Sequence, residues 1–92
     1  MSRVLIQLPR VLCELVDCAP RIPAEGATVG EALTDLVRTV PALEGHLFQE
    51  GGALRRHILC FWNQTQARKR AELDEPLTRG DILTLVNSVA GG

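Results

Sequence analysis

The chain has 92 residues, of which 46% are hydrophobic and 23% are charged, and its formal net charge is −1. This length and composition predict one globular domain with a single modest core, and the near-neutral charge disfavours nucleic acid as a partner. Every apolar run is shorter than the roughly 20 residues that a transmembrane helix needs. We therefore expect a protein that binds neither nucleic acid nor a membrane. The three cysteines are an odd number at no metal-like spacing and follow no recognisable signal peptide, so we expect a reduced, cytoplasmic protein.

The first part of the chain predicts a strand, a short helix and an edge strand. Residues 3–8 place Val4, Ile6 and Leu8 on one face of a strand and the polar Arg3 and Gln7 on the other, which predicts a strand with one buried face. Residues 10–18 carry apolar side chains at helical spacing, which favours a helical turn and leaves a strand open. Pro20 and Pro23 confine any strand over residues 19–25 to a sheet edge, because proline cannot donate a ladder hydrogen bond. The side chains expected in the core are Val4, Ile6, Leu8 and Ile22.

The clearest predicted element is an amphipathic helix that begins at Thr28 and ends before Pro41. Thr28 followed three residues later by Glu31 is a capping box, and a single apolar stripe follows it. The stripe consists of Val29, Ala32, Leu33, Leu36, Val37 and Val40. Residues 42–54 have several glycines and little periodicity, so they predict a loop or a short helical turn. The apolar residues of that segment are Leu43, Leu47 and Phe48.

The second half predicts three more strands. Residues 56–62 predict a strand in which Ile58, Cys60 and Trp62 share one face. His57, Leu59 and Phe61 share the other face, and the polar His57 indicates that this second face is the one toward solvent. Residues 63–65 predict a turn into a short strand over 66–70, and residues 82–86 predict a last strand rich in β-forming side chains. The side chains expected in the core from these strands are Ile58, Cys60, Trp62, Leu83 and Leu85.

These elements predict an α+β fold in which one main helix covers one face of a mixed sheet of four to five strands. The opposite face would then be bare, beside the strand from which the C-terminal tail leaves. An exposed apolar patch of this kind commonly marks a partner site. The predicted docking patch consists of Leu59, Phe61, Ile82, Thr84 and Val86.

Several segments together resemble the β-grasp sulfur carriers, the ubiquitin-like proteins of the ThiS/MoaD family. They are the opening of the helix, the turn before the last strand and the terminal residues, which read Gly26-Ala27-Thr28-Val29, Gly80-Asp81 and Val89-Ala90-Gly91-Gly92. Within that family, Leu8-Pro9 and Leu54-Arg55-Arg56 are most similar to the carriers that feed a cysteine synthase. Asn87-Ser88 departs from the family, since many members have prolines there. The resemblance implies a β-grasp domain over residues 1–86 and a flexible diglycine tail over residues 87–92.

The resemblance also implies that the α-carboxylate of Gly92 is the reacting group. A ubiquitin-activating-like adenylating enzyme would use ATP and Mg²⁺ to activate it, and a sulfur donor such as a rhodanese-type protein would complete the conversion to a thiocarboxylate. An acceptor synthase, either cysteine synthase or the large subunit of molybdopterin synthase, would then take the sulfur for cysteine, molybdopterin or thiamine-type biosynthesis. In the cysteine case a metallopeptidase would trim the product. Val89, Ala90 and Gly91 are the expected recognition residues.

Other functions stay open. The chain can be a ubiquitin-like modifier joined through Gly92 to lysines of target proteins, or an interaction module with an inert tail. We expect no catalytic residue, no permanent cofactor and no metal site, because His46, His57 and the cysteines have no short-spaced ligand pair. Cys13 and Cys18 are five residues apart, a spacing without a redox signature, and Cys60 is expected in the core.

Overall fold

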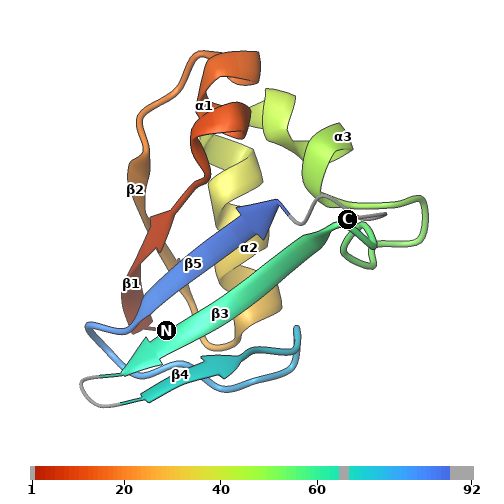
Figure 1. Ribbon diagram of the computed structural model, residues 1–92. Helices are drawn as coiled ribbons and strands as arrows, with labels where there is room; N and C mark the ends of the chain where they lie inside the picture. Colours follow the sequence, from red (N-terminus) through yellow and green to blue (C-terminus); the bar gives the residue numbers. More distant parts are fainter. Residues whose placement is uncertain (1, 65–66, 88–92) are drawn as a thin grey trace.

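The computed structural model describes residues 2–64 and 67–87, apart from the side chains of residues 63–70. Within this part of the chain, five strands form one sheet in the order β2-β1-β5-β3-β4, and α2 crosses one face of it (Figure 1). The central strands β1 and β5 are parallel, and the other neighbouring pairs are antiparallel. The elements are β1 (Ser2–Gln7), α1 (Arg10–Val16), β2 (Arg21–Gly26), α2 (Val29–Thr39), the 3₁₀ helix η1 (Pro41–Leu43), α3 (Glu44–Leu47), β3 (Ile58–Gln64), β4 (Ala67–Arg70) and β5 (Ile82–Asn87).

The helix α2 begins at the predicted cap. The Thr28 hydroxyl oxygen accepts a hydrogen bond from the Glu31 N–H at 3.3 Å, and the Glu31 carboxylate accepts one from the Ala27 N–H at 3.0 Å. The glutamate therefore binds the residue before the N-cap, one position earlier than in the usual capping box. Its negative charge also lies in the first turn, where the helix dipole favours it. The helix ends at Thr39, and Pro41 begins η1.

The core lies between the helices and the sheet, and it contains the side chains that the alternation predicts. Leu43 and Leu47, from the segment predicted as a loop or a short helical turn, are fully buried in η1 and α3. Trp62, Val37 and Val40 are half-buried and pack against the core. The buried hydrophobic residues are Val4, Ile6, Leu8, Leu12, Ile22, Ala24, Val29, Ala32, Leu33, Leu36, Leu43, Leu47, Ile58, Cys60, Ala71, Leu77, Leu83 and Leu85.

The predicted turn over residues 63–65 is wrong for Asn63 and Gln64, which continue β3. Asn63 lies opposite Ile82 of β5 and Gln64 lies opposite Ala67 of β4. Pairing with strands on both sides of β3 outweighs the intrinsic preference of asparagine for turns, because strand propensity depends strongly on such neighbours. The remaining residues of the predicted turn and strand start, 65–66, lie outside the described residues.

The strand ends near the tail also differ from the prediction. β3 begins at Ile58 because residues 55–58 form a turn, in which the Ile58 N–H donates to the Arg55 carbonyl at 2.9 Å. β5 continues through Asn87, which the sequence assigns to the tail, since Asn87 pairs with Ile58. The helical turn predicted within residues 10–18 is confirmed as α1, and the alternative of a strand there is wrong.

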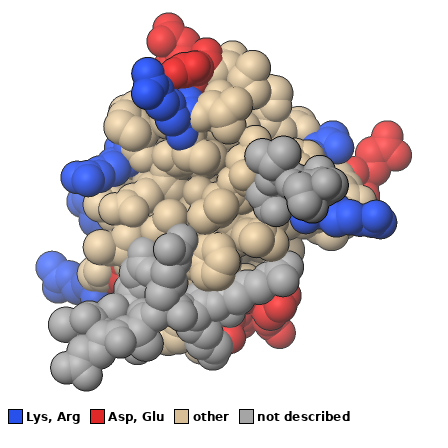
Figure 2. All heavy atoms as spheres, viewed as in Figure 1, with Lys and Arg blue, Asp and Glu red and all other residues tan. Residues whose placement is uncertain are grey.

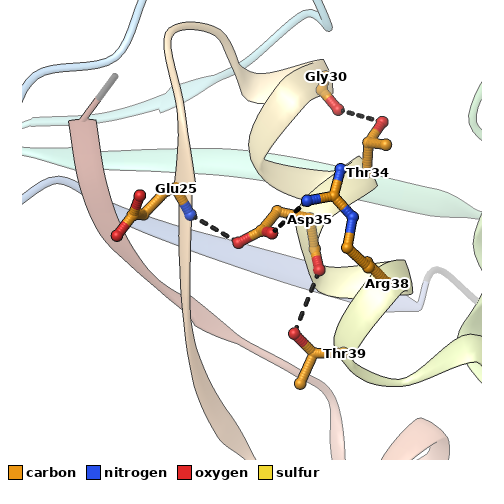
Figure 3. A network of polar contacts seen from close by, with 6 residues as sticks. All are labelled: Glu25, Gly30, Thr34, Asp35, Arg38 and Thr39. Carbon is orange, nitrogen blue, oxygen red and sulfur yellow. Dashed lines mark hydrogen bonds and ion pairs between the residues drawn. The ribbon is translucent and has the colours of Figure 1, made fainter.

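Asp35 of α2 ties the helix to the edge strand β2 (Figure 3). One of its carboxylate oxygens accepts a hydrogen bond from the Glu25 N–H at 2.9 Å, and the other lies 3.6 Å from Arg38 Nη1. The Thr39 hydroxyl donates to the Asp35 carbonyl at 3.3 Å. The carboxylate of Asp35 thus pairs with the Glu25 N–H of an edge strand. Left unpaired, such a backbone N–H can pair with a further strand.

Candidate functional site

The last described residues belong to β5, the middle strand of the sheet. β5 pairs with β3 along its whole length, while its first half also pairs with β1. Asn87, the last residue of β5, lies opposite Ile58, the first residue of β3. The predicted tail residues Val89, Ala90, Gly91 and Gly92 lie outside the described residues. The point from which they continue is therefore the end of a central strand, beside the start of β3.

The predicted docking residues share the sheet face that α2 does not cover. Leu59 lies opposite Val86, and Phe61 lies opposite Thr84. Each of the five predicted residues alternates with a core residue and is half-buried. Leu5 of β1, opposite Ile82, belongs to the same face because its neighbours in β1 are buried. We call this surface the apolar sheet face, and it consists of Leu5, Leu59, Phe61, Ile82, Thr84 and Val86.

Figure 2 looks onto this side of the molecule. Uncharged residues fill the centre of the view, and the described Lys, Arg, Asp and Glu side chains lie toward its edges. The predicted docking patch does not include Leu5, although the alternation in β1 that places Val4 and Ile6 in the core also places Leu5 on the uncovered face. The apolar sheet face therefore extends across the three central strands and ends at the root of the tail.

Thr84 is the polar member at the middle of the apolar sheet face. It lies between Gln7 of β1 and Phe61 of β3. Its hydroxyl donates a hydrogen bond to the Gln7 side-chain carbonyl oxygen at 3.2 Å. A central position flanked by strands on both sides makes Thr84 a sensitive point at which to test whether this face binds a partner.

A basic segment lies beside the root of the tail. Arg55, Arg56 and His57 are exposed and directly precede Ile58, the residue that pairs with Asn87. The Arg55 side chain is held by a hydrogen bond from its Nε to the Gly45 carbonyl at 2.6 Å. In the sequence, Arg55 and Arg56 contribute to the resemblance to the cysteine-synthase carriers, but they are not among the predicted site residues. Their place beside Asn87 follows from the register between β3 and β5, which the sequence does not reveal.

The histidines and cysteines do not form a metal site within residues 2–64 and 67–87, where no cluster of three or more potential ligands occurs. His46 is half-buried in α3, and Cys60 is in the core, where burial raises the pKa of its thiol to about 12. Cys13 and Cys18, which the sequence does not connect, are brought together at the end of α1. None of the helices in the described ranges combines the length and apolarity that crossing a bilayer requires.

The model of the ThiS family matches residues 6–92 of this chain. The chain belongs to the ThiS family. Its sequence is 41% identical to the Small archaeal modifier protein 1 of Haloferax volcanii over 73 residues, which cover 78% of this chain and 79% of that protein. The predicted membership of a ubiquitin-like carrier family is thus confirmed.

Two solved structures show the fold of this ThiS family protein. The crystal structure of SAMP1 from Haloferax volcanii matches with a TM-score of 0.84 and 33% identity, covering 99% of this chain and 100% of that one. A chain of the Amycolatopsis orientalis BexX/CysO complex matches with a TM-score of 0.80 and 27% identity, covering 97% and 99%. The predicted α+β class and β-grasp fold are confirmed. The protein is a member of the family of small sulfur carriers and ubiquitin-like modifiers.

Proposed function

We propose that this protein is a sulfur carrier that holds sulfur as a thiocarboxylate at Gly92 and donates it in cysteine, molybdopterin or thiamine-type biosynthesis. The proposal rests on the family match, which includes the tail together with the domain over residues 6–92. The position of Asn87 also supports it, because the tail continues from the end of a sheet strand that is anchored there by pairing between Asn87 and Ile58.

The chemistry starts from a carboxylate that resists nucleophiles, since it is ionised at neutral pH. An oxygen of the Gly92 carboxylate attacks the α-phosphorus of ATP on a partner enzyme, and pyrophosphate leaves. Sulfide sulfur then attacks the carbonyl carbon, and AMP leaves with the bonding electrons. If the sulfur arrives as the persulfide of a rhodanese-type protein, a thiol must afterwards cleave the acyl disulfide. This chain supplies the carboxylate, so its role is that of a carrier and not of an enzyme.

The apolar sheet face is the proposed docking surface for the adenylating enzyme and, in turn, for the acceptor synthase. It is continuous with the end of β5, so a protein bound there also lies beside the point from which the tail continues. The basic segment at Arg55 and Arg56 borders the same root and favours partners with acidic residues at that place. The similar chain in the BexX/CysO complex supports a carrier that works by binding a partner protein.

Thr84→Arg tests the docking surface. We expect the variant to bind the adenylating enzyme roughly 30-fold more weakly, because it would bury an unpaired guanidinium at the centre of the interface. Titration of the enzyme with labelled carrier measures the change. Thr34→Arg is the matched control, since Thr34 is exposed on α2, which packs on the opposite face of the sheet. Equal affinities for the two variants would contradict docking through the apolar sheet face.

Mass spectrometry of the protein purified from its source tests the sulfur chemistry. Exchange of one carboxylate oxygen for sulfur adds about 16 Da, as expected for an activated acyl group that has reacted with sulfide. Oxidation of a cysteine adds nearly the same mass, so the change must be located within the chain. Trypsin cleaves after Arg79 and releases residues 80–92, a peptide without cysteine. A mass gain on this peptide supports the sulfur carrier.

The second candidate function is protein modification through Gly92. It is favoured by the 41% identity to the Small archaeal modifier protein 1. The same digest separates the two functions, because a modifier leaves residues 80–92 joined to lysine side chains of other proteins. If the digest gave such conjugates and no thiocarboxylate, the result would contradict the sulfur carrier function and support the modifier function.

A further inference from the structure

Cys13 and Cys18 lie at the two ends of the turn that closes α1. Asp17 between them has a left-handed backbone conformation, with φ 55° and ψ 60°. The N–H groups of Asp17 and Cys18 both donate to the Cys13 carbonyl, the latter at 3.1 Å. The bond from Cys18 to Cys13 is the long hydrogen bond of a Schellman cap, which brings together the side chains of residues five apart. In a regular helix, side chains five residues apart do not lie side by side. The left-handed turn at Asp17 therefore brings the two thiols together here.

The two thiols interact and are accessible. Burial raises the pKa of the Cys18 thiol, and the neighbouring Cys13 thiol and Asp17 carboxylate raise it further. The Cys13 thiol donates a hydrogen bond to the Ala19 carbonyl at 3.8 Å. Both cysteines are half-buried with one side against the core, whereas Cys60 is 1% exposed. A small reagent can thus reach this pair of thiols while the third is shielded.

We propose that Cys13 and Cys18 form a redox-active dithiol that a hydroperoxide oxidises to an intramolecular disulfide. One thiolate attacks the outer peroxide oxygen, which gives a sulfenic acid and releases an alkoxide, or hydroxide from hydrogen peroxide. The second thiolate attacks the sulfenic sulfur, the S–S bond forms and hydroxide leaves. Protons from the two thiols convert the released anions to alcohol and water. Two electrons pass from the sulfurs to the peroxide, and an external dithiol reverses the reaction by exchange.

The disulfide acts on the end of α1 and not on the tail. It closes a loop over residues 13–18 and holds the left-handed turn at Asp17. The same helix exposes two large apolar side chains, Val11 at 44% and Leu15 at 61%. Oxidation therefore fixes the end of a helix that has an apolar outer surface. Neither the apolar sheet face nor Gly92 takes part, so this proposal is independent of the sulfur carrier function.

The test treats the reduced full-length protein with hydrogen peroxide at mildly alkaline pH, because the raised pKa of Cys18 leaves little of its reactive thiolate at neutral pH. We expect the intact mass to fall by about 2 Da, the loss of two hydrogens in one disulfide. The number of thiols per chain that an alkylating reagent labels under native conditions should fall from two before oxidation to none after it. In a second measurement, phenylarsine oxide, a trivalent arsenical that bridges neighbouring thiolates, should form a one-to-one adduct with the reduced protein.

Cys13→Ser and Cys18→Ser are the test variants, and Cys60→Ala is the control. Each serine variant should lose both the 2 Da change and the arsenical adduct, whereas Cys60→Ala should keep both. The arsenical reaction of the unaltered protein keeps the proposal testable even if a variant folds poorly. Peroxide products confined to disulfides between chains, or sulfinic acids without a bond between Cys13 and Cys18, would overturn it. Absence of the arsenical adduct from the native protein would do the same.

Discussion

Gly92→Ala is expected to form the acyl adenylate about 100-fold more slowly than the native protein, because small displacements of reacting atoms cost this much in an enzyme site. ATP and then the sulfur nucleophile must both approach the carbonyl carbon of Gly92. A Cβ on the neighbouring carbon would narrow each approach, whereas glycine leaves it open. Pyrophosphate release by the adenylating enzyme, at saturating ATP, measures the rate.

Gly45→Ala is the matched control for this variant. A Cβ added at Gly45 would have no atom within 4 Å, so the same substitution there should leave both the reaction and the fold intact. Thermal unfolding of all three proteins separates a chemical effect from a folding effect. A rate for Gly92→Ala equal to the native one would refute the steric argument, and a lower unfolding midpoint for that variant would assign its loss of activity to folding.

The parts of the fold that the sequence predicts are those specified by local patterns. The alternation of β1 and β5 places Val4, Ile6, Leu83 and Leu85 in the core, as observed. The cap at Thr28 depends on residues three apart, so it is also visible in the sequence. The five residues of the predicted docking patch lie on the uncovered sheet face, because strand alternation and a single main helix together determine which face stays uncovered, and their role in docking stays a prediction.

The parts that the sequence does not predict depend on contacts between distant segments or on one unusual backbone conformation. Asn63 extends β3 because Ile82, far along the chain, is its partner. Arg55 and Arg56 lie beside the root of the tail only through the register that pairs Ile58 with Asn87. Cys13 and Cys18 meet because Asp17 adopts a left-handed conformation, which residues other than glycine rarely take.

Gly26→Ala is expected to destabilise the domain by about 3 kcal/mol, the upper range for steric overpacking in a core. Gly26 ends β2 and is buried against the first turn of α2. An added Cβ would lie 2.5 Å from the Ala32 nitrogen and 2.8 Å from the Glu31 carbonyl carbon. Both atoms belong to the helix backbone, so no side-chain rotation relieves the clash. Urea unfolding measures the free energy, and Gly45→Ala is again the control.

Gly26→Ala and Gly92→Ala should have opposite effects, and this contrast tests whether the domain and the tail have separate roles. Below its lowered unfolding midpoint, Gly26→Ala should still be adenylated at nearly the native rate, because the substitution lies in the packing between β2 and α2. Gly92→Ala should keep the native stability and lose the reaction. If Gly26→Ala were as stable as Gly45→Ala, the close packing of β2 on α2 would be refuted. If folded Gly26→Ala were inactive, the reaction would depend on more than docking and the tail.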